Sequence, residues 1–164
     1  MKRIGLLSDT HGFLDSRIFQ LFSECDEIWH AGDIGSADVL QRLMKIAPVR
    51  AVYGNIDGQE IRNICPVSQR FTCELLNVWI THIGGYPGHF ARGIREKLLA
   101  DPPGLFISGH SHILKIMHDK KLRLLHINPG SAGKQGFHRV RTVVRFEIHG
   151  DQVKELEVAE LGTR

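Results

Sequence analysis

The sequence predicts a single α/β domain, a mixed sandwich of parallel and antiparallel strands, and three observations lead to this fold class. The first third alternates strand-like segments with segments whose apolar residues recur at helical spacing, which is typical of parallel β-α-β units. The remainder contains pairs of strands joined by turns, which indicates antiparallel hairpins. The chain has 164 residues and no repeat, linker or low-complexity tract, so residues 1–164 form one domain with a full hydrophobic core.

The first third of the chain is expected to contain three strands and two helices. Short strand-like runs occupy residues 4–8, 27–30 and 49–53, and each ends at a polar or glycine-containing loop, as buried parallel strands do. The first helix is predicted by the helical spacing of Ile18, Leu21, Phe22 and Cys25. The second is expected after a capping Ser36, with an inward face of Ala37, Leu40, Leu43, Met44 and Ala47.

The remaining elements are expected in the following order. Strands at 67–75 and 78–81 are joined by a tight turn near Leu76-Asn77, and a helix containing Ala91, Ile94 and Leu98 ends before Pro102-Pro103-Gly104. Further strands follow at 105–108, 113–117 and 122–127. In the last hairpin, one face is expected to contain Thr142, Val144, Phe146 and Ile148, and the turn His149-Gly150-Asp151 leads into a strand at 153–158.

Composition and charge exclude several classes of protein. With 42% hydrophobic and 24% charged residues, the chain is a globular protein and not a disordered one. A formal charge of +3 is too small to indicate a nucleic-acid binder, and no apolar run approaches the roughly 20 residues of a membrane span. The chain has an odd number of cysteines, Cys25, Cys65 and Cys73, and no two of them have C-x-x-C spacing. Because no secretory signal is visible either, we expect reduced thiols and a cytoplasmic protein.

Several of the 10 histidines belong to short polar clusters that follow predicted strands. The clusters are Asp9-Thr10-His11, Gly32-Asp33, Gly54-Asn55, Thr81-His82 and Gly109-His110-Ser111-His112. Ligands in open α/β sheets bind where the loops at the carboxyl ends of strands converge, so we expect the five clusters to line one pocket. Glycines precede Asp33, Asn55 and His110, which lets the backbone and ligands approach closely.

The chemistry of these clusters predicts a metal site. Two carboxylates, one amide oxygen and four imidazoles are too many ligands for one tetrahedral zinc, but they suit two divalent cations that share a bridging carboxylate. A nitrogen and oxygen set without thiolate favours manganese, iron, zinc, nickel or cobalt over calcium or copper(I). Two divalent cations against two carboxylates leave a charge of about +2, which favours an anionic substrate such as a phosphate ester.

Each cluster taken singly has an ordinary structural explanation. Asp-x-His, Gly-Asp and Gly-Asn are common in turns, and His82 alone would be interpreted as a hydrogen-bonded core histidine. Only Gly-His-Ser-His is informative by itself. The order and spacing of all five clusters make coincidence a poor explanation.

Together the clusters resemble the signature of the calcineurin-like metallophosphoesterase superfamily. The short chain is similar to the small single-domain bacterial and archaeal phosphodiesterase branch, and Asn128-Pro129-Gly130-Ser131 resembles a further turn of that branch. The resemblance implies a four-layer α/β/β/α sandwich, with two mixed sheets flanked by helices and a dinuclear site at one edge of the sheets. It also implies a phosphoesterase, above all a phosphodiesterase for a small phosphodiester or nucleotide-like substrate.

The resemblance also implies a role for each candidate ligand. One metal would be held by Asp9, His11, Asp33 and His112, and the other by Asp33, Asn55, His82 and His110, with Asp33 as the bridge. The implied reaction is in-line attack of a metal-bridging hydroxide on phosphorus without a covalent enzyme intermediate, with Asp33, Asn55 and His110 as catalytic residues. Manganese is the favoured metal, with iron, zinc, nickel or cobalt as alternatives.

One position departs from the family pattern. Many members have a histidine after Gly-Asn that is thought to protonate the leaving group, whereas this chain has Gly54-Asn55-Ile56-Asp57. Isoleucine cannot transfer a proton, so we expect activated phosphodiesters to be better substrates than esters with poor leaving groups. His89 is a candidate replacement acid, although an exposed loop histidine is the simpler interpretation of it.

A second function remains open, namely a non-catalytic metal-binding interaction scaffold like the eukaryotic retromer subunit that resembles this branch. The complete ligand set favours catalysis, and Ile56 leaves room for the scaffold. No membrane or specific nucleic-acid partner is expected, and self-association is left open. The basic stretch of Lys134, Arg139, Arg141 and Arg145 lacks interleaved aromatic residues, so its arginines are expected on the solvent-exposed face of a strand. No role is assigned to His118, His126, His138 and His149.

Overall fold

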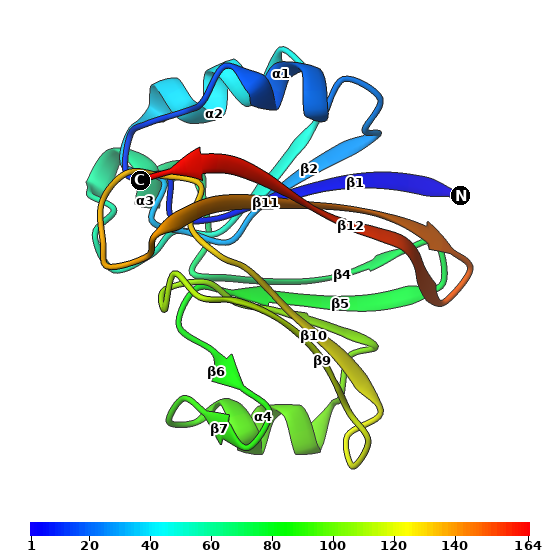
Figure 1. Ribbon diagram of the computed structural model, residues 1–164. Coiled ribbons are helices and arrows are strands. Elements are labelled where there is room, and N and C mark those ends of the chain that lie inside the picture. The colour runs from blue at the N-terminus through cyan, green and yellow to red at the C-terminus, as the bar shows by residue number, and fades with distance from the viewer.

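The computed structural model describes all of residues 1–164 and has four layers. Two five-stranded sheets pack face to face, and helices cover both outer faces (Figure 1). The helices are α1 (Arg17–Leu21), α2 (Ala37–Met44), α3 (Gln59–Ile64) and α4 (Ile94–Ala100). This arrangement confirms the predicted α/β/β/α sandwich. None of these helices is long and apolar enough to cross a bilayer.

Both sheets are mixed: the first has three parallel strands at one end and an antiparallel hairpin at the other, and the second has three parallel strands flanked by an antiparallel strand at each edge. The first sheet has the order β12 (Gln152–Thr163), β11 (Val140–His149), β1 (Lys2–Leu7), β2 (Glu27–His30) and β3 (Val49–Ala51). The second has the order β4 (Ser68–Cys73), β5 (Leu76–Thr81), β8 (Leu105–Ile107), β10 (Leu124–Pro129) and β9 (Leu114–Asp119). A small ribbon of β6 (Gly85–Tyr86) and β7 (His89–Phe90) lies near α4 (Figure 1). Strands β1, β2 and β3 are parallel to one another, and so are β5, β8 and β10. The carboxyl ends of the parallel strands in each sheet therefore lie at one edge.

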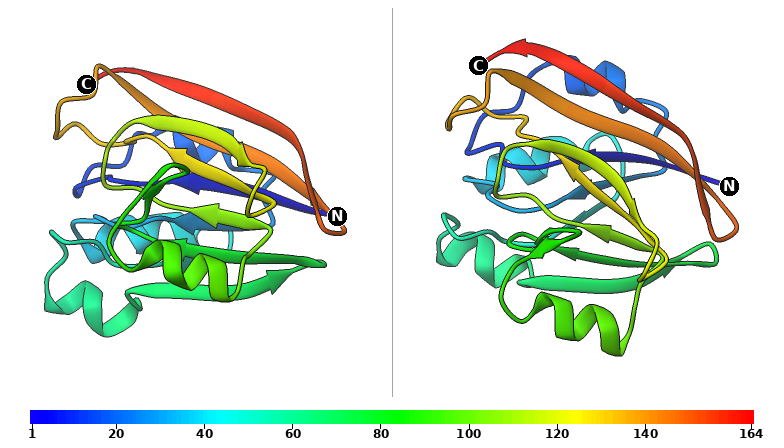
Figure 2. Two further views of the ribbon diagram at one scale, coloured as in Figure 1. Left: turned by 90° about the horizontal axis from the view of Figure 1, so that it is seen from below. Right: turned by 60° about the horizontal axis from the view of Figure 1, so that its bottom comes forward.

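Alternation of side chains along the strands produces three apolar cores between the four layers. The core between the two sheets includes Ile4, Leu6, Trp29, Val78, Ile80, Ile107, Ile127, Val144, Phe146 and Ile148. The core under α1 and α2 includes Leu7, Ile18, Phe22, Ile28, Leu40 and Leu43, and the core under α4 includes Trp79, Ile94, Leu98, Phe106 and Leu124. The predicted face of Thr142, Val144, Phe146 and Ile148 is buried. Figure 2 shows the β11–β12 hairpin, which forms one edge of the first sheet.

Some elements differ from the expectation. The hairpin turn lies at Glu74 and Leu75, not at Leu76-Asn77, because Leu76 is buried and pairs with Cys73 at the start of β5. The first helix ends at Leu21, and β12 continues past the predicted end at 158 to Thr163.

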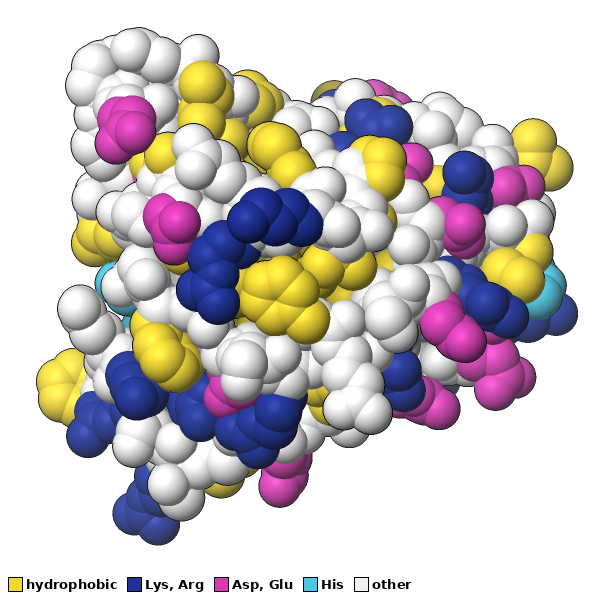
Figure 3. Space-filling model, turned by 90° about the horizontal axis from the view of Figure 1, so that it is seen from above, with side chains coloured by type: hydrophobic (Ala, Val, Ile, Leu, Met, Phe, Trp, Pro, Cys, Tyr) yellow, Lys and Arg dark blue, Asp and Glu magenta, His cyan; other side chains and the backbone are white.

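The inward face of α2 also differs from the prediction at two residues, Val39 and Met44. Val39, Leu40 and Leu43 are buried, whereas Met44 is 56% exposed in the last turn. On the face seen from above in Figure 3, charged side chains of both signs surround apolar ones, as on the solvent side of a layered fold.

Helix α3 and the β6–β7 ribbon were not predicted, since they are very short and α3 buries only Ile61.

Arg141 is buried, which corrects its expected place on a solvent-exposed face. Alternation places Arg141 on the same face of β11 as Val143 and Arg145, and this face is covered by the layer that contains α1, so the Arg141 side chain is buried beside Asp15. The Arg141 guanidinium lies 2.8 Å from Asp15 Oδ2 and donates hydrogen bonds to the carbonyls of Leu161 and Thr163. Burial opposes ionisation of Asp15, but hydrogen bonds from Arg17 and Arg141 outweigh it and hold the pKa of this carboxyl well below its usual value. This ion pair connects the loop after β1 to β11.

Replacing Arg141 by methionine is predicted to destabilise the fold. In Arg141→Met the buried Asp15 keeps only Arg17 as an ionic partner, so urea unfolding at pH 7 should show a free energy of unfolding lower by about 3 kcal/mol. The pKa of Asp15 is lower in the folded than in the unfolded chain, so the stabilising pair is lost as pH falls below the ordinary carboxyl range. The difference from wild type should therefore shrink between pH 5 and pH 2. Arg139→Met, at an exposed position before the same strand, is the control, and equal effects of the two substitutions would contradict the assignment.

Candidate metal centre

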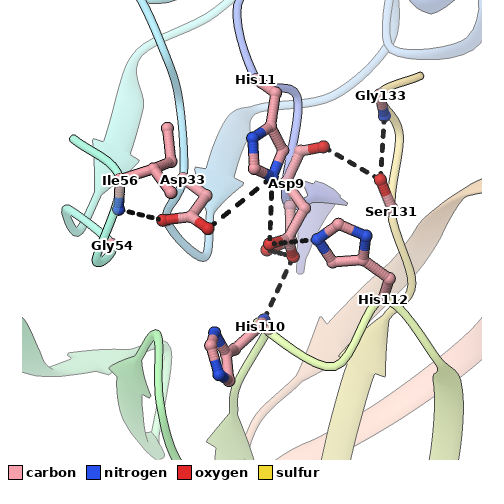
Figure 4. A network of polar contacts seen from close by, with 12 residues as sticks. Asp9, His11, Asp33, Gly54, Ile56, His110, His112, Ser131 and Gly133 are labelled. Carbon is pink, nitrogen blue, oxygen red and sulfur yellow. Dashed lines mark hydrogen bonds and ion pairs between the residues drawn. The ribbon is translucent and has the colours of Figure 1, made fainter. Parts of the chain in front are cut away.

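The structure brings all seven predicted ligands together at the carboxyl ends of the strands. Asp9 and His11 follow β1, Asp33 follows β2, Asn55 follows β3, His82 follows β5, and His110 and His112 follow β8. These strands come from both sheets, so the cluster lies where the two sheets meet at one edge. Figure 4 shows the side chains of several of these loops pointing toward one another.

The side chains form two groups that could each hold a cation. The ligand atoms of Asp9, His11 and His112 lie within 4.8 Å of one another, and so do those of Asp33, His82 and His110. Asp33 faces both groups, because its Oδ2 lies 3.2 Å from His82 Nε2 and 3.7 Å from His11 Nε2. Asn55 joins the second group through its Oδ1, which is 3.0 Å from His110 Nδ1. Asp33 therefore has the position of a carboxylate shared by two sites.

The backbone is strained at five of the seven candidate ligands. Positive φ angles between 47° and 69° occur at Asp9, His11, Asp33, His110 and His112. Residues other than glycine rarely adopt this left-handed backbone conformation, and among them aspartate, asparagine and histidine tolerate it best. Only three other non-glycine residues in the chain share it, so the strain is concentrated where the side chains converge.

Two of the glycines before the ligands are required by close packing, as the sequence indicates. A Cβ atom on Gly54 would collide with Asp33 Oδ1, and one on Gly109 would collide with Ser8 Oγ and lie 2.9 Å from Asp9 Oδ2. These positions allow the loops after β3 and β8 to pass directly against the carboxylates of the loops after β1 and β2.

Hydrogen bonds behind His112 determine which of its ring nitrogens faces the cluster. His138 Nε2 lies 2.8 Å from the carbonyl oxygen of Gly133, and because a carbonyl only accepts, this nitrogen carries the proton. In a neutral His138 the other ring nitrogen, Nδ1, is then an acceptor, and it lies 3.2 Å from His112 Nδ1. His112 must therefore donate from Nδ1, which leaves a lone pair on its Nε2, 3.1 Å from Asp9 Oδ1.

The same reasoning applies to His82 in the other group. Its Nδ1 lies 2.7 Å from the carbonyl oxygen of Ala31 and donates to it. Its Nε2 then carries a lone pair in the neutral ring and lies 3.2 Å from Asp33 Oδ2 without the alignment of a hydrogen bond. Burial opposes protonation of His82, but the nearby Asp33 and Asp9 outweigh it and raise its pKa, and the pKa of Asp33 is lowered, with His82 as the main cause acting against burial.

Lone pairs therefore face lone pairs in both groups, and only a cation or a proton between them removes the repulsion. Asp9 Oδ1, His11 Nε2 and His82 Nε2 are buried and have no hydrogen-bond partner, which is a costly state for polar atoms. Imidazole nitrogens and carboxylate oxygens are ligands for borderline divalent metals. The residues present thus fit two divalent cations.

Several supporting residues were not identified from the sequence. The Asp57 carboxylate accepts hydrogen bonds from the backbone N–H groups of Ile34, Gly35 and Gly54, and so joins the loops after β2 and β3. Its place three residues after Gly54, in a Gly-Asn-x-Asp turn, is a signal that could have identified it. For His138 the sequence contains no such signal, because it lies 26 residues from His112 and approaches it only in the fold.

Further contacts hold the other ligand loops in place. Ser8 Oγ donates to Asp9 Oδ2 at 2.6 Å, and the backbone N–H of His110 donates to the same oxygen. In the turn at 128–131, Asn128 donates to the carbonyl of Gly109 and Ser131 donates to the carbonyl of Asp9. The turn that resembles the family pattern therefore supports two of the ligand loops.

His89 lies apart from this cluster. It is an exposed residue of β7, its ring centroid is 5.0 Å from that of Tyr86, and no hydrogen bond, ion pair or ring contact joins it to a candidate ligand. At position 56, the Ile56 side chain is 46% exposed, and its backbone N–H donates to Asp33 Oδ1.

Comparison with known proteins identifies the family. A probable metallophosphoesterase of Methanothermobacter thermautotrophicus is 35% identical over 136 residues, which cover 78% of this chain and 76% of that protein. Among solved structures, an archaeal phosphodiesterase superposes with a TM-score of 0.78 at 23% identity over 97% of this chain and 99% of its own. Vps29 of Chaetomium thermophilum gives a TM-score of 0.77 at 15% identity over 99% of each chain. At these identities the two structures demonstrate a shared fold only. The calcineurin-like phosphoesterase superfamily domain matches residues 1–151, and the chain therefore belongs to that superfamily.

Proposed function

We propose that this protein is a dinuclear metal-dependent phosphodiesterase. The observation that carries the proposal is the pair of close contacts between imidazole lone pairs and carboxylates, His112 with Asp9 at 3.1 Å and His82 with Asp33 at 3.2 Å. Each contact is relieved by a cation or a proton, and family membership, which associates divalent metals with phosphoester hydrolysis, favours the cation.

The proposed metal ligands follow the two groups. Asp9, His11, Asp33 and His112 would hold one cation, and Asp33, Asn55, His82 and His110 would hold the other. When bound, two such cations polarise a phosphate ester and make water a nucleophile at neutral pH. Manganese is our favoured ion, with iron, zinc, nickel and cobalt as alternatives, because the ligand set contains no thiolate.

The chain itself positions these groups and leaves one side of the site open. Asp9, Asp33 and His82 are buried, whereas Asn55 and His110 are exposed, so a substrate approaches from the side of Asn55 and His110. We assign catalytic roles to Asn55 and His110 because they lie on this open side, and to Asp33 because it faces both groups. The substrate is proposed to be a small phosphodiester or nucleotide-like compound, hydrolysed by direct in-line attack of water.

Hydrolysis of bis-p-nitrophenyl phosphate in the presence of Mn²⁺ tests this function. Asp33→Asn and Asn55→Ala should each lower kcat/KM by at least about 100-fold, because even residues that merely support metal ligands contribute about 10–100-fold. Asp151→Asn and Asn63→Ala replace the same residue types at exposed positions away from the site and should leave the rate unchanged. Full metal loading without turnover would favour the interaction scaffold instead.

The isoleucine at position 56 predicts a strong dependence on the leaving group. Without an acid at this position, rates on a series of aryl methyl phosphates should fall steeply as the pKa of the departing phenol rises. Ile56→His should make this dependence shallower and accelerate the poorest leaving groups by up to about 100-fold, because a general acid contributes about 10²–10⁴-fold.

Ile64→His provides the control for a new surface histidine, since Ile64 is 59% exposed on α3. A shallow dependence already present in the wild type would show that another group supplies the proton, and would contradict this account of Ile56.

A further inference from the structure

A pocket next to the candidate metal centre is not explained by metal binding. It has a volume of about 170 Å³ and includes residues of β6, the short strand that Figure 1 shows beyond the second sheet, toward α4. Its walls include Tyr86 of β6, the loop residues His110 and Ser111, Lys115 of β9 and His126 of β10. His110 belongs to both the pocket and the metal centre, so a molecule bound at the cations can extend into this pocket.

His126 provides an unused hydrogen-bond acceptor in the pocket wall. The side chain is fully buried, and its Nδ1 lies 3.1 Å from the carbonyl oxygen of Phe106, to which it must donate. Burial lowers the pKa of His126 to about 4, so the ring is neutral at pH 7 and its Nε2 carries a lone pair. That Nε2 is buried without any hydrogen-bond partner, which is unfavourable unless a donor enters the pocket.

Two donors complement this acceptor. Ser111 Oγ accepts hydrogen bonds from Asn128 Nδ2 and from the backbone N–H of Ile113, so its own hydrogen is free to be donated. The Lys115 ammonium lies 3.6 Å from the centre of the Tyr86 ring and forms no ion pair. The pocket therefore offers one neutral acceptor and two donors, one of them positively charged.

We propose that this pocket binds the organic group of the phosphoester and selects groups that carry hydroxyls. A hydroxyl can donate to His126 Nε2 and at the same time accept from Ser111 or Lys115, which satisfies the acceptor and one of the two donors, whereas an alkyl or plain aryl group satisfies none. Polyols and the ribose of nucleosides share this chemistry. The proposal rests on the proposed function, because it assigns a substrate group to the same site.

A matched pair of substrates tests the selection. Glyceryl p-nitrophenyl phosphate and propyl p-nitrophenyl phosphate differ only in the hydroxyls of the retained group, and thymidine 5′-(p-nitrophenyl phosphate) distinguishes nucleosides from polyols. With Mn²⁺, the wild type should prefer the glyceryl or the thymidine ester over the propyl ester by at least about 10-fold in kcat/KM, because unsatisfied polar groups reject the analogue that lacks its hydroxyl. The preferred one of these two esters shows whether the pocket binds a polyol or a nucleoside.

Variants of the pocket should abolish the preference without abolishing activity. Lys115→Met and His126→Leu should bring the ratio close to 1 through the loss of the hydroxylated substrate, while the propyl ester is still hydrolysed. Lys154→Met, on exposed β12, is the matched control and should keep the wild-type ratio. Because His126 is buried, Lys115→Met keeps the test decisive if His126→Leu fails to fold.

A binding measurement separates failure of the pocket from failure of the catalytic proposal. In Zn²⁺-loaded protein labelled with ¹⁵N, glycerol 1-phosphate should shift the Nε2 resonance of His126 toward lower frequency, as a new hydrogen bond does, whereas propyl phosphate should not. Hydrolysis of all esters without preference, together with an unmoved resonance, would overturn the pocket and leave the phosphodiesterase intact. A shifted resonance without turnover of any ester would contradict the catalytic proposal and support the pocket.

Discussion

In the candidate metal centre, lone pairs of histidine nitrogens and of carboxylate oxygens are held close together, and most of the surrounding structure contributes to this arrangement. Asp9 faces His112, and Asp33 faces His82, at distances at which acceptor atoms repel one another. The Nδ1–H groups of His82 and His112 donate to Ala31 and His138, respectively, so neither neutral ring can turn its proton toward the carboxylates. A cation or a proton relieves this repulsion, and without either the fold must supply the free energy that holds the side chains together.

The four-layer scaffold supplies that support from both sheets. Three apolar cores fix the strands, and the strands end at the loops that carry the ligands. Short polar links then join one loop to the next, from Asp57 between the loops after β2 and β3 to Ser131 at the loop after β1. The left-handed backbone at five candidate ligands indicates that this rigid framework tolerates local strain in order to aim the side chains.

The sequence was sufficient for those features that depend on local pattern. The strands before each polar cluster, the burial of alternate residues in β11 from Thr142 onward and the convergence of seven ligands all follow from periodicity and from the rule that strand ends meet at one edge. The features that it could not predict depend on contacts between distant residues. The burial of Arg141 against Asp15, under the layer that contains α1, and the approach of His138 to His112 are of this kind. The short helix α3 was missed because it contains a single buried side chain, which gives no periodic signal.

Direct observation of bound metal tests the central claim that the facing lone pairs are completed by two cations. Crystals of the protein grown with Mn²⁺ and measured at the manganese absorption edge should give two anomalous peaks per chain. One peak should contact Asp9, His11 and His112, the other should contact Asp33, His82 and His110, and the Nδ1 contacts of His82 and His112 should remain as they are. Absence of both peaks at saturating Mn²⁺, or rings turned so that Nδ1 faces the carboxylates, would contradict the account.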